Sequence, residues 1–133
     1  PMGNNFVKSI MRAAQAQPTL RVVDDQRGSP TSVEDLAAVI KATAAGSVQG
    51  ILHATNRGDC TWYEIARAIV EEMNLEISVL PISTAEAGRL APRPPYSVLG
   101  QQRLARLDLA PRDWREALNQ FVKAERALVT VHP

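Results

Sequence analysis

The stretch Leu20-Arg21-Val22-Val23-Asp24-Asp25-Gln26-Arg27-Gly28-Ser29-Pro30-Thr31 decides how this chain is organised. Its apolar residues predict a short strand at 20–23, and the polar run that follows ends in a turn at Gly28 and Pro30. A helix is expected directly afterwards. Polar side chains between a strand and a helix start are where α/β proteins often contact ligands. The alternative is a solvated turn followed by a well-capped helix.

The start of that helix carries two overlapping capping boxes, because Thr31 precedes Glu34 by three residues and Ser32 precedes Asp35 by three. The neighbouring acids Asp24-Asp25 resemble a general acid/base pair. Adjacent residues of an extended segment point to opposite faces, however, so the two carboxylates are not expected to share one site.

Apolar residues at spacings of three and four predict three further helices, and apolar or β-branched runs predict three further extended segments. The best-marked helix begins at Thr61, which forms a capping box with Glu64, and Asn74 is expected to end it in the left-handed conformation. Trp62 and Trp114 fall on apolar helical stripes and are expected in the core. The helices are expected at 5–16, 33–45, 61–74 and from 113 onward, with a helical turn at 101–106, strands at 20–23, 50–55, 76–81 and 96–99, and a long Pro-rich loop at 83–95. This alternation predicts a mixed α/β or α+β fold.

The composition excludes several classes of protein. The 133 residues carry a formal net charge of +1, and the scattered charges give no case for nucleic acid or an anionic membrane surface. No apolar run reaches the roughly 18 residues that a membrane span needs. The single cysteine, Cys60, excludes an internal disulfide and fits a reducing compartment, so a cytoplasmic location is expected. We expect Cys60 to be a half-buried structural residue, His53 to be a strand residue, and no metal site to be present.

Four stretches, in the same order, resemble the dTDP-4-dehydrorhamnose reductases, a family of extended short-chain dehydrogenase/reductases. The resemblance spans nearly all 133 residues, and its motifs are specific as a set. They are Asn5-Phe6-Val7, the segment 22–31 quoted above, Trp62-Tyr63-Glu64-Ile65-Ala66-Arg67-Ala68-Ile69, and Arg93-Pro94 with Ser97-Val98-Leu99 leading to Asp113-Trp114-Arg115-Glu116-Ala117-Leu118. The resemblance implies that residues 1–133 form the C-terminal, substrate-binding portion of such an enzyme. Residues 31–55 would belong to the cofactor domain of the intact protein.

Two features of the family are missing from this chain. The seven glycines form no Gly-rich turn of the kind that holds a dinucleotide pyrophosphate. The Tyr-x-x-x-Lys pair that the family uses for proton transfer is also absent, since Tyr63 is followed four residues later by Arg67 and Tyr96 by Gly100. We therefore expect no catalytic residue in this chain and no cofactor bound to it, although the intact enzyme would use NADPH or NADH.

The candidate binding residues are polar groups at chain breaks, which suit an anionic nucleotide-sugar. A pyrophosphate needs donors, such as a helix N-terminus, an amide or an arginine fork. By resemblance, Asn5 matches the family's Asn-Phe before the first helix, and Arg93 matches its Arg-Pro in the long loop. Gln26 and Arg27 lie where the family's strand-to-helix loop borders the sugar nucleotide. Arg89 has no counterpart in the motif and is expected to be uninvolved, and for Arg93 the alternative is an exposed loop residue.

The resulting hypothesis is the substrate-binding part of a dTDP-4-dehydrorhamnose reductase, inactive alone. The expected partners are a dTDP-sugar, the missing N-terminal cofactor domain and a second copy of the chain. A second copy is expected because cutting through the cofactor domain would leave apolar residues on 33–45 and 50–55 without partners. One alternative is a non-catalytic regulatory or binding module of the same superfamily, and another is a fragment with no independent activity.

Overall fold

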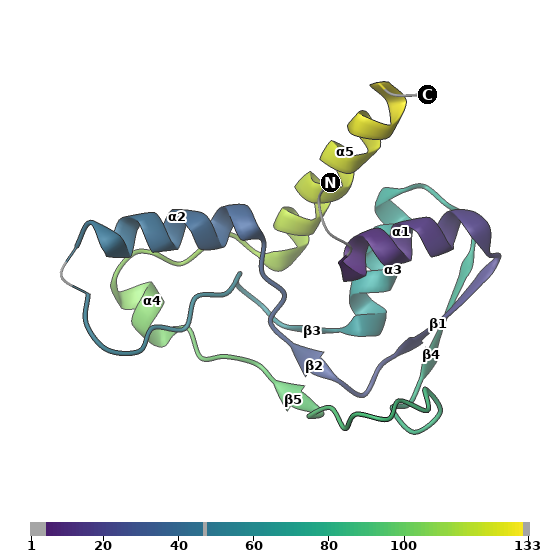
Figure 1. The fold of residues 1–133 in the computed structure, drawn as a ribbon, viewed down its shortest axis with the longest axis horizontal. Coiled ribbons are helices and arrows are strands. Elements are labelled where there is room, and N and C mark those ends of the chain that lie inside the picture. The colour runs from purple at the N-terminus through teal and green to yellow at the C-terminus, as the bar shows by residue number, and fades with distance from the viewer. Residues whose placement is uncertain (1–4, 47, 132–133) are drawn as a thin grey trace.

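The computed structural model describes residues 5–46 and 48–131, with side chains described as far as residue 128. It is a mixed α/β structure, as the sequence predicts (Figure 1). The helices are α1 (Phe6–Ala16), α2 (Val33–Ala44), α3 (Trp62–Glu72), α4 (Gln102–Arg106) and α5 (Trp114–Val131). The strands are β1 (Thr19–Val23), β2 (Arg27–Gly28), β3 (Cys60–Thr61), β4 (Ser78–Ile82) and β5 (Tyr96–Ser97).

Side-chain caps explain where the principal helices begin. Asn5 caps α1, its side-chain oxygen accepting a hydrogen bond from the Lys8 N–H. Thr61 and Glu64 form the predicted capping box at the start of α3, and Asn74 beyond its end has a φ of 53°. The prediction for α2 is only half right. Ser32 caps that helix, but no reciprocal bond completes a capping box there.

Two small sheets connect segments that lie far apart in the sequence. β1 and β4 pair in parallel, and the expected strand at 76–81 is therefore present with bounds shifted by about two residues. In the second sheet β2 lies between β3, which is antiparallel to it, and β5, which is parallel to it. Because β2 follows β1 after a short turn, this second sheet brings the end of the long loop at 83–95 back beside residues 24–28.

The core is built around α3, which lies between α1 and α5 and also contacts β1 and β4. One cluster of buried residues joins α3 to α5, with Ile69 and Val122 fully buried in it. A second cluster joins α3 to α1 and β1 through Ala66, Ala14 and Val22. Trp114 is buried in the first cluster, as predicted. On these faces apolar residues recur every three to four positions, and this spacing is why the sequence predicts the helices of this part.

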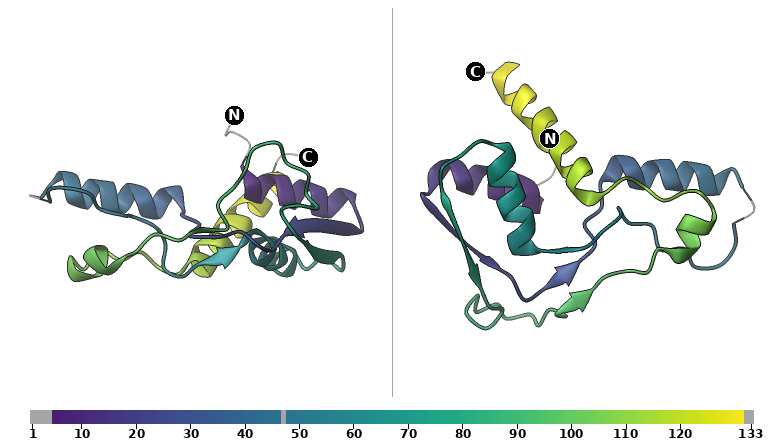
Figure 2. Two further views of the ribbon diagram at one scale, coloured as in Figure 1. Left: turned by 90° about the horizontal axis from the view of Figure 1, so that it is seen from below. Right: turned by 180° about the vertical axis from the view of Figure 1, so that it is seen from behind.

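α2 and α4 lie at the other end of the molecule from α1 and α3, whereas the start of α5 reaches the start of α2, where the Gln120 amide donates a hydrogen bond to Glu34 (Figures 1 and 2). The prediction of a strand at 50–55 is wrong, because this segment has no regular secondary structure. A strand is stabilised by its neighbours, and no strand of the described residues pairs with this segment. His53, expected in that strand, is exposed on an irregular segment, and Ile51 is 81% exposed.

Candidate functional site

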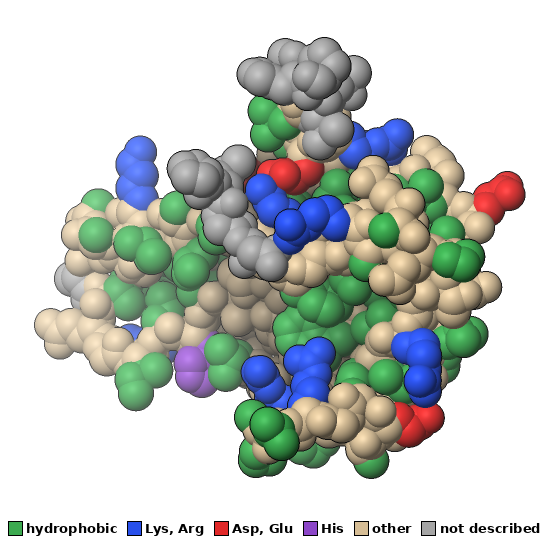
Figure 3. Space-filling view, turned by 45° about the vertical axis from the view of Figure 1, so that its right-hand side comes forward, with side chains coloured by type: hydrophobic (Ala, Val, Ile, Leu, Met, Phe, Trp, Pro, Cys, Tyr) green, Lys and Arg blue, Asp and Glu red, His purple; other side chains and the backbone are tan. Residues whose placement is uncertain are grey.

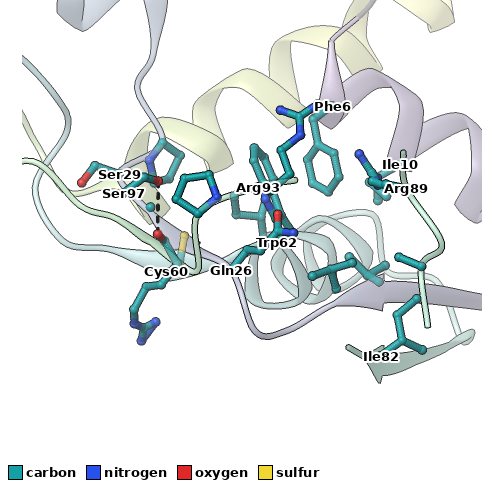
Figure 4. Close-up of a pocket in the computed structure, with 18 of the residues that line it drawn as sticks. Phe6, Ile10, Gln26, Ser29, Cys60, Trp62, Ile82, Arg89, Arg93 and Ser97 are labelled. Atoms are coloured by element: carbon teal, nitrogen blue, oxygen red, sulfur yellow. Dashed lines mark hydrogen bonds between the residues drawn. The ribbon is translucent and has the colours of Figure 1, made fainter. Parts of the chain in front are cut away.

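A cavity of about 740 Å³ opens between the helical core and the loop at 83–95. Its volume lies within the range typical of small-molecule sites. The walls come from α1, the end of β1, β2, the start of α3, and the loop (Figure 4). Three of the four residues that the sequence nominated for binding, Gln26, Arg27 and Arg93, line this cavity.

One wall of the cavity is aromatic and apolar. The rings of Phe6 and Trp62 lie 4.7 Å apart between centroids and are tilted by 56°, an arrangement that aromatic pairs favour. Ile10 and Ile65 extend the same wall. The prediction that Trp62 is a core residue is wrong, since its side chain is 41% exposed. An apolar helical stripe marks both the core and the wall of a cavity, so the spacing of Trp62 could not separate these two environments.

Two further lining residues of the cavity are basic. Arg89 and Arg93 both line it from the loop, and both are exposed (Figure 4). Within the part of the chain that the structure describes, neither guanidinium has a hydrogen bond or an ion pair. Hydrophobic and basic side chains accordingly meet on one face of the molecule (Figure 3). Arg89 was expected to be uninvolved, but it lines the same cavity as Arg93.

Gln26 and Arg27 line the cavity but are already engaged with other side chains. The Arg27 guanidinium forms ion pairs of 2.8 Å with Asp59 and 2.9 Å with Glu64. Gln26 is buried, and its side-chain amide donates a 2.9 Å hydrogen bond to the Thr84 hydroxyl. Both side chains therefore hold the walls of the cavity in place.

Asn5 is exposed, and its side-chain oxygen is occupied by the cap of α1. The structure does not place Asn5 among the residues that line the cavity, although the next residue, Phe6, does line it. The sequence missed Phe6, Trp62 and Arg89 as cavity residues. The relevant pattern was present in the sequence: an aromatic residue directly follows the capping residue at the start of both α1 and α3.

The two neighbouring carboxylates after β1 have different partners, so the prediction that they do not form a pair is confirmed. Asp24 accepts a 2.6 Å hydrogen bond from the Thr61 hydroxyl, whereas Asp25 accepts hydrogen bonds from Thr84. Cys60 is buried more completely than expected. Burial, and next the nearby Glu64 carboxylate, raise the pKa of its thiol to about 12, which leaves it protonated and inert at neutral pH.

The described residues contain neither a cluster of metal-ligating side chains nor a Gly-rich strand-to-helix turn. They contain no group of three or more His, Cys, Asp or Glu side chains that could hold a metal. The connection from β2 to α2, residues 29–32, contains no glycine, so it does not form a Gly-rich turn in which a pyrophosphate could lie against the backbone. No helix in the ranges 5–46 and 48–131 is long and apolar enough to cross a membrane.

Comparison with known proteins identifies relatives of this chain. It is 46% identical over 122 residues to the spore coat polysaccharide biosynthesis protein SpsK of Bacillus subtilis, covering 91% of this chain and 42% of that protein. It is 40% identical over 134 residues to the dTDP-4-dehydrorhamnose reductase of Mycolicibacterium smegmatis, covering 98% of this chain and 41% of that enzyme. The chain therefore spans less than half the length of these curated relatives.

The chain is also similar to solved structures of dTDP-4-dehydrorhamnose reductases. The dTDP-4-dehydrorhamnose reductase of Bacillus anthracis, determined in complex with NADP, superposes with a TM-score of 0.85 at 41% identity, covering 91% of this chain and 43% of that one. The orthologue from Clostridium acetobutylicum superposes with a TM-score of 0.88 at 36% identity, covering 94% of this chain and 45% of that one. The resemblance drawn from the four sequence motifs is confirmed. The sequence profile of the family described as RmlD substrate binding domain matches residues 1–127, and the chain belongs to that family.

Proposed function

We propose that this chain is the substrate-binding part of a dTDP-4-dehydrorhamnose reductase and that its cavity holds the nucleotide diphosphate end of a dTDP-sugar. The observation that carries the proposal is that one cavity is lined both by an aromatic pair, Phe6 and Trp62, and by two arginines, Arg89 and Arg93, which have no ion pair within the described residues. A nucleotide diphosphate has two matching parts: a flat base, which suits the aromatic side chains, and an anionic diphosphate, which suits the arginines.

The chemistry of each wall suits one half of this ligand. A base stacks favourably on aromatic side chains, which suits the exposed face of Trp62. A guanidinium fork pairs with two phosphate oxygens at once, which suits Arg93 and Arg89. Because neither arginine has an anionic partner in the described part of the chain, no ion pair has to break before a diphosphate binds.

In the intact enzyme the reduction itself would take place on groups outside this chain. The nicotinamide cofactor would supply hydride there, and this chain would bind and orient the sugar nucleotide. We assign no catalytic residue to it. We also propose that residues 31–55, which include α2, belong to the cofactor domain of the intact protein. The exposed apolar side chains of Ile40 and Ile51 would then be covered by the rest of the cofactor domain.

The test compares three ligands by titration calorimetry on the purified chain: dTDP, thymidine and inorganic pyrophosphate. If both walls contribute, dTDP binds more tightly than either part alone, because one ligand then gains the stacking and the ionic contacts together. Saturable binding of dTDP with weaker binding of thymidine and of pyrophosphate supports the proposal. No saturable dTDP binding, or pyrophosphate binding as tight as that of dTDP, would overturn it.

A further inference from the structure

Both ends of the loop that carries the two arginines are attached to one short segment, residues 24–28. We call residues 83–95 the arginine loop. At its start, Thr84 is hydrogen-bonded to Asp25 and Gln26. At its end, the Arg27 N–H donates a 2.8 Å hydrogen bond to the Pro95 carbonyl, and β2 pairs with β5 directly afterwards. The two attachments lie within a few residues of each other on the chain that follows β1.

In the first attachment, Thr84 uses both its N–H and its hydroxyl. Its N–H donates to the Asp25 carboxylate at 2.8 Å, and its hydroxyl donates to the same carboxylate at 2.5 Å. The hydroxyl also accepts the 2.9 Å hydrogen bond from the buried Gln26 amide. A compact turn follows, in which the Glu86 carboxylate accepts hydrogen bonds from the N–H and the hydroxyl of Ser83.

The middle of the arginine loop has no such attachment. Residues 89–94 show no backbone hydrogen bond within the described structure. Proline fixes φ near –65° and restricts the residue before it. Pro92 and Pro94 therefore stiffen the segment on both sides of Arg93. With stiff residues between two fixed ends, the position of Arg93 depends on whether both ends stay attached.

We infer that Asp25, Gln26 and Thr84 are positioning residues that hold the arginine loop ready for an anionic ligand. This inference rests on the proposed function, because it assigns these residues a role in presenting Arg93 to the diphosphate. A side chain that is ordered before binding loses less conformational entropy when the ligand arrives, so preorganisation raises affinity without adding a contact. Gln26, nominated from the sequence as a substrate contact, acts in this arrangement through Thr84.

Thr84→Val is the sharpest test, because valine keeps the shape of threonine and removes only the hydroxyl that contacts Asp25 and Gln26. We expect dTDP affinity, measured by calorimetry on the whole chain, to fall by roughly 3- to 10-fold. Thr84→Ser keeps the hydroxyl and should restore most of this loss. Thr43→Val makes the same chemical change on α2, where the hydroxyl donates to the Val39 carbonyl, and should leave dTDP affinity unchanged.

A double-mutant cycle separates positioning from general destabilisation. If Thr84 acts by placing Arg93, Thr84→Val costs little further affinity in an Arg93→Ala background, so the two changes are strongly non-additive. The same fold-loss in both backgrounds would overturn the inference. A Thr84→Val chain that binds dTDP normally, while Arg93→Ala binds poorly, would overturn the inference and leave the proposed function standing. Absence of dTDP binding by the unmodified chain would overturn both.

Discussion

The buried side-chain amide of Asn56 donates a 2.7 Å hydrogen bond to the carboxylate of Asp35, at the start of α2. The same amide nitrogen also donates to the Arg112 carbonyl, and the side-chain oxygen of Asn56 accepts a hydrogen bond from the Ser32 N–H. Arg112 in turn pairs with Asp35 at 2.9 Å. One fully buried side chain therefore connects the start of α2, the segment before β3 and the segment before α5.

Asn56→Ala is expected to lower the free energy of unfolding by about 1–3 kcal/mol, because it removes three part-buried hydrogen bonds, to the Ser32 N–H, the Asp35 carboxylate and the Arg112 carbonyl. Chemical denaturation followed by circular dichroism measures this loss. Gln15→Ala, which removes an exposed amide on α1, is the matched control and should change stability by less than about 0.5 kcal/mol. Similar small losses for both variants would mean that water replaces Asn56 at no cost.

The elements that could be predicted from the sequence are those whose stabilising contacts are local. The capping box of Thr61 and Glu64 and the apolar stripe behind it lie within one helix, so α3 was predicted almost to the residue. The prediction of a strand at 50–55 was wrong for the opposite reason. Its apolar content resembles a strand, but strand formation depends on a neighbour, and the sequence of the segment does not say whether a neighbour exists.

The same distinction explains what could be predicted of the cavity. Arg93 was identified from a loop motif, and Gln26 and Arg27 from the polar run after β1. Their partners could not be identified, since Thr84 lies 58 positions from Gln26 and Glu64 lies 37 positions from Arg27. Only the folded chain shows that Arg27 is ion-paired, that Gln26 is buried and that Arg93 has no ion pair within the described residues.

The contact between Asp25 and Thr84 predicts a dependence on pH. Hydrogen bonds from the Thr84 hydroxyl and then from its N–H hold the pKa of Asp25 below its ordinary value of 3.8. A lowered pKa means that the contact contributes its full stabilisation above pH 3.8, and that this is lost as the pH falls through the lower value of the folded state. The Thr84 amide resonance in NMR spectra should therefore stay constant from neutral pH to about pH 4 and shift only below it.

Thr84→Val supplies the check on this pH dependence. The hydroxyl is the largest cause of the shift, so its removal should raise the pKa of Asp25 toward the ordinary value. Glu86 is the internal control, because the N–H of Ser83 and then its hydroxyl are the main causes of the lowered pKa of that carboxyl, while Arg21 lowers it and Asp25 raises it by smaller amounts. An Asp25 side-chain titration that is the same in both chains would show that Thr84 does not stabilise the carboxylate.

Self-association is expected at high concentration. Val33 is 77% exposed and Ile40 is 57% exposed on α2, and Ile51 is more exposed still. Another copy of the chain is the nearest source of apolar surface that could cover them. Light scattering over a concentration series should show a rising mean mass, and Ile40→Arg should reduce the rise. Gln15→Arg adds the same charge at an exposed polar position on α1 and should have no such effect. A strictly monomeric chain at every concentration would contradict this prediction.

The purified chain is expected to show no oxidation of NADPH in the presence of a dTDP-4-keto sugar. Its sequence has neither a Gly-rich turn for the pyrophosphate of the cofactor nor a Tyr-x-x-x-Lys pair for proton transfer. The loss of NADPH absorbance should therefore match that of a buffer control. Turnover clearly above that control, retained through purification, would show that other residues of this chain bind the cofactor and donate the proton.

Arg93→Lys is expected to be a severe change for ligand binding, although it keeps the charge. An ammonium group cannot reproduce the two-pronged contact of a guanidinium with phosphate oxygens. Losing one charge-assisted contact to a bound anion costs about 1.5–3 kcal/mol, which is roughly a 10- to 150-fold loss of dTDP affinity. Calorimetry with dTDP measures this directly.

The control for Arg93 has to be an arginine outside the cavity. Arg106 is exposed on α4 and does not line the cavity, so Arg106→Lys should leave dTDP affinity unchanged. Arg89→Lys should fall between the two, because Arg89 lines the cavity but lies nearer the turn that Glu86 closes. Small and equal effects at all three positions would mean that the arginine loop supplies only diffuse positive charge. Arg93 would then be an ordinary solvated residue of the loop, and the aromatic wall alone would have to account for any binding of the nucleotide.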